Sequence, residues 1–198
     1  RWLQYSLFTP LFRNHSADGT RLQELYQFDN IASAAEMIKI RYALIPYLYS
    51  EFLKAALNDE MMFRPLAFDF PEDNTAKQAE DQLFLGNELM IAPIYKQNAQ
   101  GRYVYLPEEM MMISMKSVSD YTAAVLPAGH HYVEVPLDTL VFFIRKGKAI
   151  PFGAAADNTS QIDMSALRLL GYDGSTYELY SDNGYSPEPE DSLKITTL

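Results

Sequence analysis

The stretch IASAAEMIKIRYALIPYLYSEFLKAAL, residues 31–57, carries the longest helical pattern in the chain. Its apolar residues recur at alternating spacings of four and three, which is the period of one helix face. This stripe consists of Ile31, Ala35, Ile38, Tyr42, Ile45, Tyr49, Phe52 and Ala56. Leu44, Tyr47 and Leu48 add apolar surface outside the stripe. A helix that is apolar on more than one side is expected to pack between layers of a larger body. Pro46 lacks the N–H that the carbonyl of Tyr42 needs, so we expect a kink there.

After this helix the pattern changes to short runs of β-branched, aromatic and aliphatic residues, separated by residues that favour turns. Runs of this length and spacing are typical of an antiparallel β-sandwich. The runs lie at residues 62–70, 83–86, 89–94, 102–107, 110–118, 131–137, 140–151, 167–172, 175–181 and 192–198. Asp173-Gly174 and Asn183-Gly184 are tight-turn signals, because both dipeptides tolerate a positive φ.

The composition is that of a folded, acidic chain. Its 198 residues are 48% hydrophobic and its net charge is −10, which suits one large or two small domains. The acidity argues against nucleic acid as a partner. Neither a long apolar run nor a signal peptide is visible, and cysteine is absent, so we expect no membrane contact and a cytoplasmic location. The abrupt start at Arg1-Trp2 predicts that the chain is cut from a longer protein.

The segment LFRNHSADGT contains the first candidate site, at His15. Arg13, Asn14 and His15 together offer several hydrogen-bond donors, of the kind that hold the hydroxyls of a polar ligand. The same residues would also suit a surface loop whose side chains cap nearby backbone. The pattern alone leaves both interpretations open.

No metal or cofactor site is expected. His130 and His131 are adjacent, so on a strand they point to opposite faces and cannot chelate one ion. The methionine runs at 61–62 and 110–115 suit core filling better than soft-metal ligation. The acidic stretch 181–192 lacks the spacing of a calcium loop.

Several carboxylates could serve as a general acid or base, but their spacing selects no pair. They are Asp69, Glu72, Asp73, Glu80, Asp81 and Glu88. The chain also lacks the G-x-S-x-G, P-loop, G-x-G-x-x-G and HExxH motifs.

Seven collinear strings together resemble the C-terminal third of glycoside hydrolase family 31, which includes retaining α-glucosidases and α-xylosidases. They are RWLQYSLFTPLFRNH (1–15), IRYALIPYLYSEF (40–52), FRPLAFDFPED (63–73), QLFLGNELMIAPI (82–94), YVYLPE (103–108), VPLDTLVFFIRKGKAIP (135–151) and YELYSDNGYS (177–186). The last string departs from the family's Y-x-D-D-G pattern at Ser181 and Asn183.

The resemblance implies an α/β part followed by an all-β part. Residues 1–80 would be the C-terminal end of a catalytic (β/α)8 TIM barrel, and residues 81–198 an antiparallel β-sandwich domain with a sub-boundary near 153–160. The string FRPLAFDF would then be the last barrel strand, with the helix before it on the outside of the barrel.

The resemblance also implies a division of the chemistry. Family members use an aspartate nucleophile and an aspartate acid/base, and both motifs would lie upstream of Arg1. His15 matches the family's R-N-H motif, whose histidine hydrogen-bonds hydroxyls of the sugar in the −1 subsite. We therefore expect an oligosaccharide or α-glucoside as substrate, the upstream barrel as a partner, and no activity in the isolated chain.

A second hypothesis is a free-standing β-sandwich module that binds carbohydrate or a protein partner without catalysis. It requires exposed aromatic residues, for which Tyr103, Tyr105 and Tyr121 are candidates. If the barrel is missing, the apolar faces of residues 1–60 must instead be covered by self-association or stay mobile.

Overall fold

The computed structural model describes residues 1–21 and 23–198. Its first part is helical, with the short helix α1 (Trp2–Ser6), the 3-10 helix η1 (Leu25–Gln27) and the 28-residue helix α2 (Ile31–Asn58). Helix α2 runs through Pro46 and ends at Asn58, and the next residue, Asp59, has a left-handed φ of 54°. The expected long helix is thus confirmed to within one residue at its C-terminal end.

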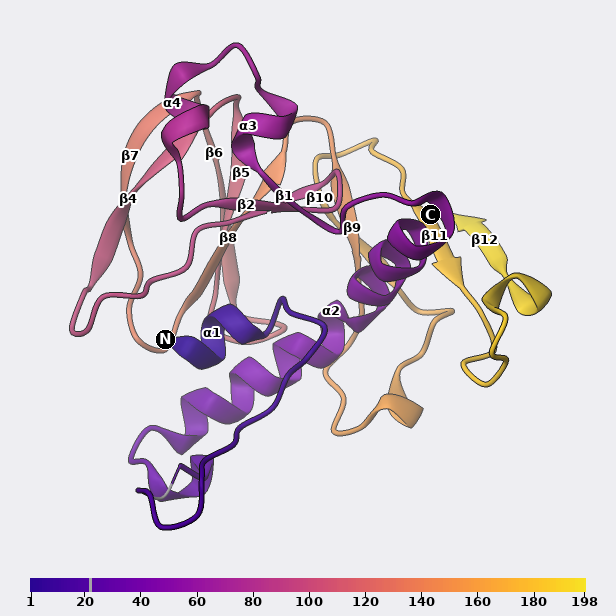
Figure 1. Cartoon of the computed structure of the whole chain (residues 1–198), viewed down its shortest axis with the longest axis horizontal. Helices are drawn as coiled ribbons and strands as arrows, with labels where there is room; N and C mark the ends of the chain where they lie inside the picture. Colours follow the sequence, from indigo (N-terminus) through magenta and orange to yellow (C-terminus); the bar gives the residue numbers. More distant parts are fainter. Residues whose placement is uncertain (22) are drawn as a thin grey trace.

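The rest of the chain is rich in short strands, shown in Figure 1. They are β1 (Phe63–Pro65), β2 (Leu83–Leu85), β3 (Leu89–Ile91), β4 (Gly101–Leu106), β5 (Met110–Met115), β6 (Tyr121–Leu126), β7 (Gly129–Glu134), β8 (Leu140–Arg145), β9 (Ala149–Phe152), β10 (Arg168–Gly171), β11 (Glu178–Ser181) and β12 (Lys194–Thr197). The short helices α3 (Leu66–Asp69), α4 (Asn74–Gln78), η2 (Thr159–Gln161) and η3 (Pro189–Ser192) lie between them.

Every strand pair is antiparallel within the described residues. One six-stranded sheet has the order β1-β2-β3-β8-β5-β6, and the pairs β4-β7, β9-β10 and β11-β12 form separate two-stranded sheets. The prediction of many short strands is therefore confirmed.

The expectation that FRPLAFDF forms a barrel strand is wrong in this structure. Only Phe63–Pro65 is a strand, and it pairs antiparallel with Leu83–Leu85 before the chain turns into α3. A TIM-barrel strand has parallel neighbours on both sides. Here the strand paired with β1 is β2, which follows it in the chain and is antiparallel to it.

The inner strands of the six-stranded sheet contribute to two cores, because successive side chains point to opposite faces. Phe142 and Ile144 of β8 share a core with α2, β9 and β11. Phe143, between them, belongs to a second core with Val104 of β4 and Val133 of β7. The sheet consequently has α2 on one face and the β4-β7 ribbon on the other (Figure 1).

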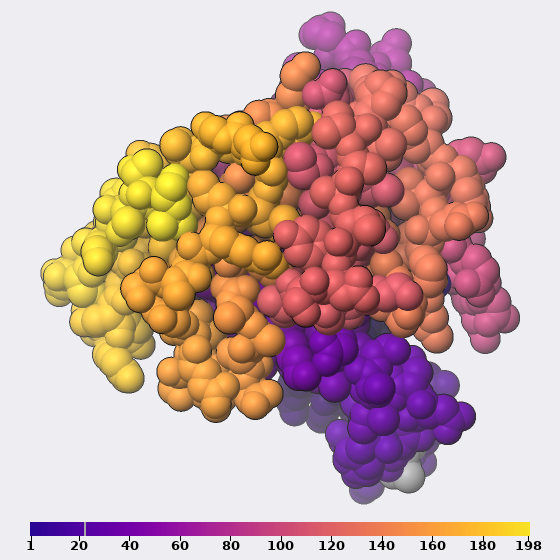
Figure 2. Space-filling view, turned by 180° about the vertical axis from the view of Figure 1, so that it is seen from behind, coloured from indigo at the N-terminus to yellow at the C-terminus, as the bar shows by residue number. Residues whose placement is uncertain are grey.

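Helix α2 buries the opposite side from the stripe with the clearest period. Its core residues are Ala34, Met37, Ile40, Ala43, Leu44, Tyr47, Leu48 and Leu53. On the stripe, Ile31, Tyr49 and Phe52 are exposed, although they are large and apolar. Figure 2 shows the N-terminal half of α2 projecting below the β-rich body. The helix therefore has two apolar faces, of which one is covered in this chain.

Two local features were not expected from the sequence. Strand β6 (Tyr121–Leu126) has no counterpart among the predicted runs. The predicted run 140–151 is divided into β8 and β9 by a turn at Gly147, whose φ is 67°. The segment after β9 returns to the helix, since Gly153 N–H donates to Ala43 O over 2.8 Å. Among the described residues, no helix combines the length and the apolar character needed to cross a membrane.

Candidate functional site

The loop that carries His15 is fixed at its start by helix α2. Arg41 of α2 donates to Leu7 O over 2.6 Å and to Thr9 O over 2.8 Å, and its guanidinium lies 4.8 Å from the centre of the Phe12 ring. Burial lowers the pKa of Arg41 from its usual value. One half-buried cation thus positions the backbone just before the R-N-H segment.

The three polar side chains of this segment lie in irregular, exposed structure. Arg13 Nη2 lies 3.2 Å from His15 Nδ1. Because a guanidinium can only donate, Nδ1 accepts, and the proton of a neutral His15 is then on Nε2. Asn14 Nδ2 donates to Gln23 O across the loop. This arrangement leaves His15 Nε2–H as a donor for an incoming hydroxyl.

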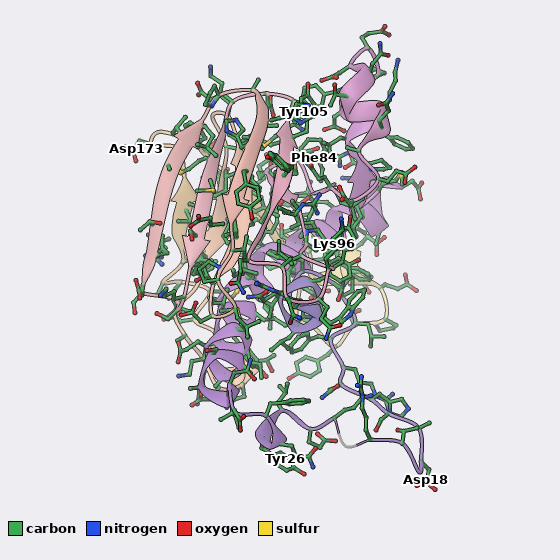
Figure 3. All side chains as sticks on the ribbon, turned by 90° about the vertical axis from the view of Figure 1, so that its left-hand side faces the viewer. Asp18, Tyr26, Phe84, Lys96, Tyr105 and Asp173 are labelled. Atoms are coloured by element: carbon green, nitrogen blue, oxygen red, sulfur yellow. The ribbon has the colours of Figure 1, made fainter. Side chains whose placement is uncertain are left out.

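A hollow of about 410 Å³ lies beside the loop. Its described lining residues are Trp2, Leu3, Ser6, Phe12, Arg13, Asn14, Arg21, Gln23, Leu25 and Phe28. His15 is not among them. In Figure 3 the loop reaches away from the sheets, with Asp18 at its tip and Tyr26 nearer the body. The structure therefore brings Arg13 and Asn14 to a hollow and places His15 next to them.

Among the carboxylates, Asp69 belongs to an ion cluster. Arg64 Nε lies 2.9 Å from Asp69 Oδ1, and Arg145 Nη1 lies 2.5 Å from Oδ2. Burial pushes the pKa of Asp69 up, but the hydrogen bonds from Arg64 and Arg145 outweigh burial and keep the pKa below its usual value. A carboxyl held ionised by two arginines is suited to bracing α3 against β8 and not to donating a proton.

Glu88 and Glu51 are buried where α2 meets β2 and β3. Tyr47 Oη lies 3.3 Å from Glu88 Oε2, and Tyr177 Oη donates to Glu51 Oε1 over 2.6 Å. Burial, followed by the charge of Glu51, raises the pKa of Glu88. Neither carboxylate lines the hollow beside the His15 loop. This pair is an internal link between helix and sheet.

The remaining carboxylates have structural partners or face solvent. Asp73 accepts from the backbone N–H groups of Thr75 and Ala76 at the start of α4. Asp81 pairs with Arg102 over 2.5 Å. Glu72 and Glu80 are exposed. No catalytic pair emerges among the described residues.

The expected structural roles of the histidines and methionines can also be located. His131 Nε2 lies 2.8 Å from Pro127 O, and the His130 ring packs 4.9 Å from that of Tyr105. Met110 and Met115 are fully buried in the two cores. Within the described ranges, no group of three or more histidine or carboxylate side chains could hold a metal ion.

The structure also shows an aromatic surface that the sequence patterns did not single out as a whole. Tyr103, one of the three proposed exposed tyrosines, is indeed exposed, and Tyr132 lies opposite it in the β4-β7 register. Tyr105 and Tyr121 are partly buried. Only the strand pairing brings Tyr132 beside Tyr103, since the two are far apart in the chain.

Models of two domains of one enzyme family match this chain. The model described as "Glycosyl hydrolases family 31 TIM-barrel domain" matches residues 1–51, and that described as "Glycosyl hydrolase family 31 C-terminal domain" matches residues 59–150. The two matches meet between residues 51 and 59, and the division at residue 80 stays a prediction.

Relatives of known activity match along nearly the whole chain. Alpha-glucosidase 2 of Bacillus thermoamyloliquefaciens is 33% identical over 203 residues, covering 98% of this chain and 25% of the relative. Lysosomal alpha-glucosidase of Mus musculus is 31% identical over 206 residues, covering 94% of this chain and 22% of the relative. The chain thus spans about a quarter of the length of these relatives.

Solved structures agree with these matches. An α-xylosidase of family 31 from Xanthomonas citri has a TM-score of 0.82 at 26% identity, covering all of this chain and 22% of the other. A dextranase of family 31 from Flavobacterium johnsoniae, complexed with glucose, has a TM-score of 0.80 at 26% identity, covering 99% of this chain and 24% of the other. With both domain models matched in order and the fold shared, the chain belongs to glycoside hydrolase family 31.

Proposed function

We propose that this chain is the C-terminal segment of a retaining α-glucosidase-like enzyme that hydrolyses terminal α-glycosidic bonds of oligosaccharides. The observation that carries the proposal is the ordered match of both family 31 domain models, supported by α-glucosidases among the relatives. The substrate class is also supported by dextranase structures holding glucose or isomaltotriose.

The chemistry of retention requires two carboxylic groups on opposite sides of the scissile bond. One attacks the anomeric carbon to form a covalent glycosyl-enzyme, while the other first protonates the leaving oxygen and then activates water. In our proposal both aspartates lie in the barrel upstream of Arg1. The described carboxylates of this chain are committed to ion pairs, caps or the buried Glu51-Glu88 link, or face solvent.

The role of this chain in the chemistry is then to bind sugar through His15. The support is local geometry: Arg41 anchors the preceding backbone, and Arg13 orients the imidazole so that Nε2 can donate. A hydrogen bond to a sugar hydroxyl that strengthens in the transition state lowers the barrier without proton transfer.

We also propose how the two parts fit into a complete enzyme. The upstream barrel covers the exposed part of the α2 stripe, where Ile31 and Phe52 are large, apolar and exposed. The β4-β7 ribbon and the six-stranded sheet, which share one core, form the two layers of the β-sandwich domain.

The test of the proposed function is to assay p-nitrophenyl α-glucoside with the 198-residue chain and with the complete protein that contains it. Only the complete protein is expected to hydrolyse this substrate. Proton NMR should show that the released sugar keeps the anomeric configuration of the substrate. Turnover by the 198-residue chain would refute the assignment of both catalytic carboxylates to the upstream part. Inversion by the complete protein would refute the mechanism.

A non-catalytic binding module is the second candidate, favoured by the exposed pair Tyr103 and Tyr132. The open reading frame separates the two. Several hundred codons in frame before Arg1 support the enzyme, whereas a start codon directly before Arg1 supports the module.

A further inference from the structure

The outer face of the β4-β7 ribbon carries two exposed tyrosines that hold each other in place. Tyr103 is 71% exposed and Tyr132 is 55% exposed. They are directly opposite in the antiparallel register, and their ring centres lie 5.2 Å apart at an interplanar angle of 71°. Edge-to-face packing of this kind restrains both rings while leaving their faces to solvent. The exposed area is consequently rigid and aromatic.

Gly101 shapes this surface at the start of β4. A Cβ at Gly101 would lie only 3.1 Å from Cζ of Tyr132 and would overlap Val133 O. Its φ is not in the left-handed region, so the close approach and not the backbone angle accounts for glycine. The missing side chain lets the Tyr132 ring lie close to the strand.

The tyrosines form one side of a pocket of about 300 Å³, at the low end of the range for small-molecule sites of roughly 300–1,000 Å³. The pocket is lined by Asp81, Pro93, Ile94, Tyr95, Lys96, Ala99, Gly101, Arg102, Tyr103 and Tyr132. Tyr95, which precedes the β4-β7 ribbon in the chain, also lines the pocket and is exposed. Figure 3 faces this side of the molecule, with Tyr105 of β4 above and Lys96 below.

Charged groups at the pocket are held in defined positions. Arg102 Nη1 donates to Pro93 O over 2.8 Å and to Asp81 O over 3.1 Å. Arg102 Nη2 lies 2.5 Å from Asp81 Oδ1, while Tyr95 Oη donates to Asp81 Oδ2 over 3.0 Å. The Arg102 guanidinium is also 5.8 Å from the centre of the Tyr95 ring. The pocket thus offers the Asp81 carboxylate as a fixed acceptor and one remaining Nη2 N–H of Arg102 as a donor, between aromatic walls.

We propose that this pocket is a second, non-catalytic binding site for an α-linked gluco-oligosaccharide. A pyranose ring has one face of C–H groups, which packs on tyrosine, and a rim of hydroxyls, which Asp81, Arg102 and Lys96 can bind. The pocket has room for a small ligand, and further rings of the chain continue into solvent. The choice of α-glucan rests on the proposed function.

The site would hold a longer substrate on the enzyme while its end reaches the active site. Two linked binding events raise the effective concentration of the chain end, so the gain should grow with substrate length. A substrate with a single sugar ring cannot reach both sites and should gain nothing.

Binding is tested on the complete protein with its active site saturated by an iminosugar inhibitor. Isothermal titration with maltotriose and with isomaltotriose should show residual binding of at least one. Tyr103→Ala or Tyr132→Ala should weaken it by about threefold to tenfold, from the stacking lost. Tyr132→Phe should keep it, because the ring remains. Tyr185→Ala is the matched control, since Tyr185 is 93% exposed and lies outside the pocket.

Kinetics separate this proposal from the proposed function. The two alanine variants should lower kcat/KM on a long α-glucan and leave p-nitrophenyl α-glucoside hydrolysis unchanged. If the wild-type protein hydrolyses neither substrate, the proposed function is wrong. The titration still shows whether the pocket binds an oligosaccharide. The proposed site would be overturned if the inhibited wild-type protein bound neither trisaccharide. It would also be overturned if Tyr103→Ala, Tyr132→Ala and Tyr185→Ala bound the trisaccharide equally well. The first of these results would arise if another segment of the complete protein occupied the pocket.

Discussion

Gly86 lies between β2 and β3, directly beside Glu51 and Tyr47 of α2. Its φ is 61°, and a Cβ there would overlap Glu51 Oε2 and the Tyr47 hydroxyl. Tyr47 is fully buried and donates to Leu85 O over 2.5 Å, so it has no room to move. A side chain at residue 86 is therefore excluded by the backbone angle and by the space.

Gly86→Ala is predicted to destabilise the protein by about 2–4 kcal/mol, since it adds overpacking to a left-handed backbone. Gly184→Ala is the matched control, because Gly184 has a similar φ of 69° but nothing within 4 Å of its Cβ position. The control should cost only about 1–2 kcal/mol. Urea unfolding followed by tyrosine fluorescence measures both, and equal losses would contradict the packing argument.

Glu88 makes stability depend on pH in a defined direction. Its pKa is raised, first by burial and then by the charge of Glu51. A carboxyl whose pKa rises on folding stabilises the fold fully below its unfolded pKa of about 4.3, and this contribution is lost as pH rises through the folded-state pKa.

Glu88→Gln should therefore raise the Tm at neutral pH, and the gain should shrink as pH falls toward 4. Glutamine keeps a polar side chain beside the Tyr47 hydroxyl, which donates to Leu85 O, and it removes the buried charge. Scanning calorimetry across this pH range provides the measurement, with Glu72→Gln, at an exposed position, as the control. A gain that does not vary with pH would show that charge is not the cause.

His15→Ala in the complete protein should lower kcat/KM for p-nitrophenyl α-glucoside by about tenfold to a thousandfold, if one or two transition-state hydrogen bonds are lost. Arg13→Ala should have a smaller effect in the same direction, because it removes only the partner at Nδ1. Steady-state kinetics measure kcat/KM for both variants. An unchanged kcat/KM for His15→Ala would show that His15 does not bind the substrate.

At the scale of elements, helix α2 was predictable and its orientation was not. Its period and length follow from residues 31–57 alone, but two apolar faces compete for the core. The side with Leu44, Tyr47 and Leu48 is buried because the six-stranded sheet and β9 cover it. The stripe with the regular period remains partly exposed, at Ile31, Tyr49 and Phe52, and nothing in that period indicates which face the sheet will cover.

The exposed stripe predicts how the 198-residue chain behaves in solution. Phe52 and Leu53 are adjacent in α2, but Phe52 is 50% exposed and Leu53 is 3% exposed. Phe52→Gln should reduce self-association with little loss of stability, because it removes surface that no described residue covers. Leu53→Gln should destabilise strongly, because it buries an unpaired amide.

Light scattering after size exclusion measures association, and thermal unfolding measures stability. A wild-type chain that is monomeric at high concentration would contradict the prediction that the exposed face drives association. Similar unfolding temperatures for the two variants would contradict the burial pattern.

Strand β6, which the sequence did not predict, shows a second limit of prediction from local sequence. Its sequence YTAAVL has two alanines at its centre and a weak strand signal. It becomes a strand because it pairs with β5 over six residues, from Met110 with Leu126 to Met115 with Tyr121. A neighbour's hydrogen bonds, which the local sequence does not contain, decided the element.

At the scale of the whole molecule, side chains join the helical and β-rich parts at several distant points. Arg1 donates to Val135 O over 2.7 Å and to Ala99 O over 2.9 Å. Near the other end, Tyr177 donates to Glu51 and the N–H of Tyr180 donates to Ser50 Oγ over 2.9 Å. The helical and β-rich parts are therefore connected through polar contacts between side chains and backbone as well as through the chain.

Tyr177→Phe should cost about 1–3 kcal/mol, since Glu51 is buried and would lose a hydrogen-bond donor. Tyr185→Phe, on an exposed residue, should cost nothing measurable. Because the link joins the two parts, the Tyr177 variant should also broaden unfolding, with a van't Hoff enthalpy below the calorimetric one. Calorimetry tests this, and a sharp transition at a lower temperature would show that other contacts maintain cooperativity.

The sequence by itself determined the long helix, most of the strands, the absence of thiol chemistry and the family, because these depend on local periodicity, composition and collinear strings. Only the tertiary structure decided which face of α2 is buried, that Phe63–Pro65 joins an antiparallel sheet, and that Glu51 faces Glu88. It alone placed Tyr132 beside Tyr103. Each of these depends on contacts between residues far apart in the chain, and such contacts are set by packing and strand pairing that no single segment encodes.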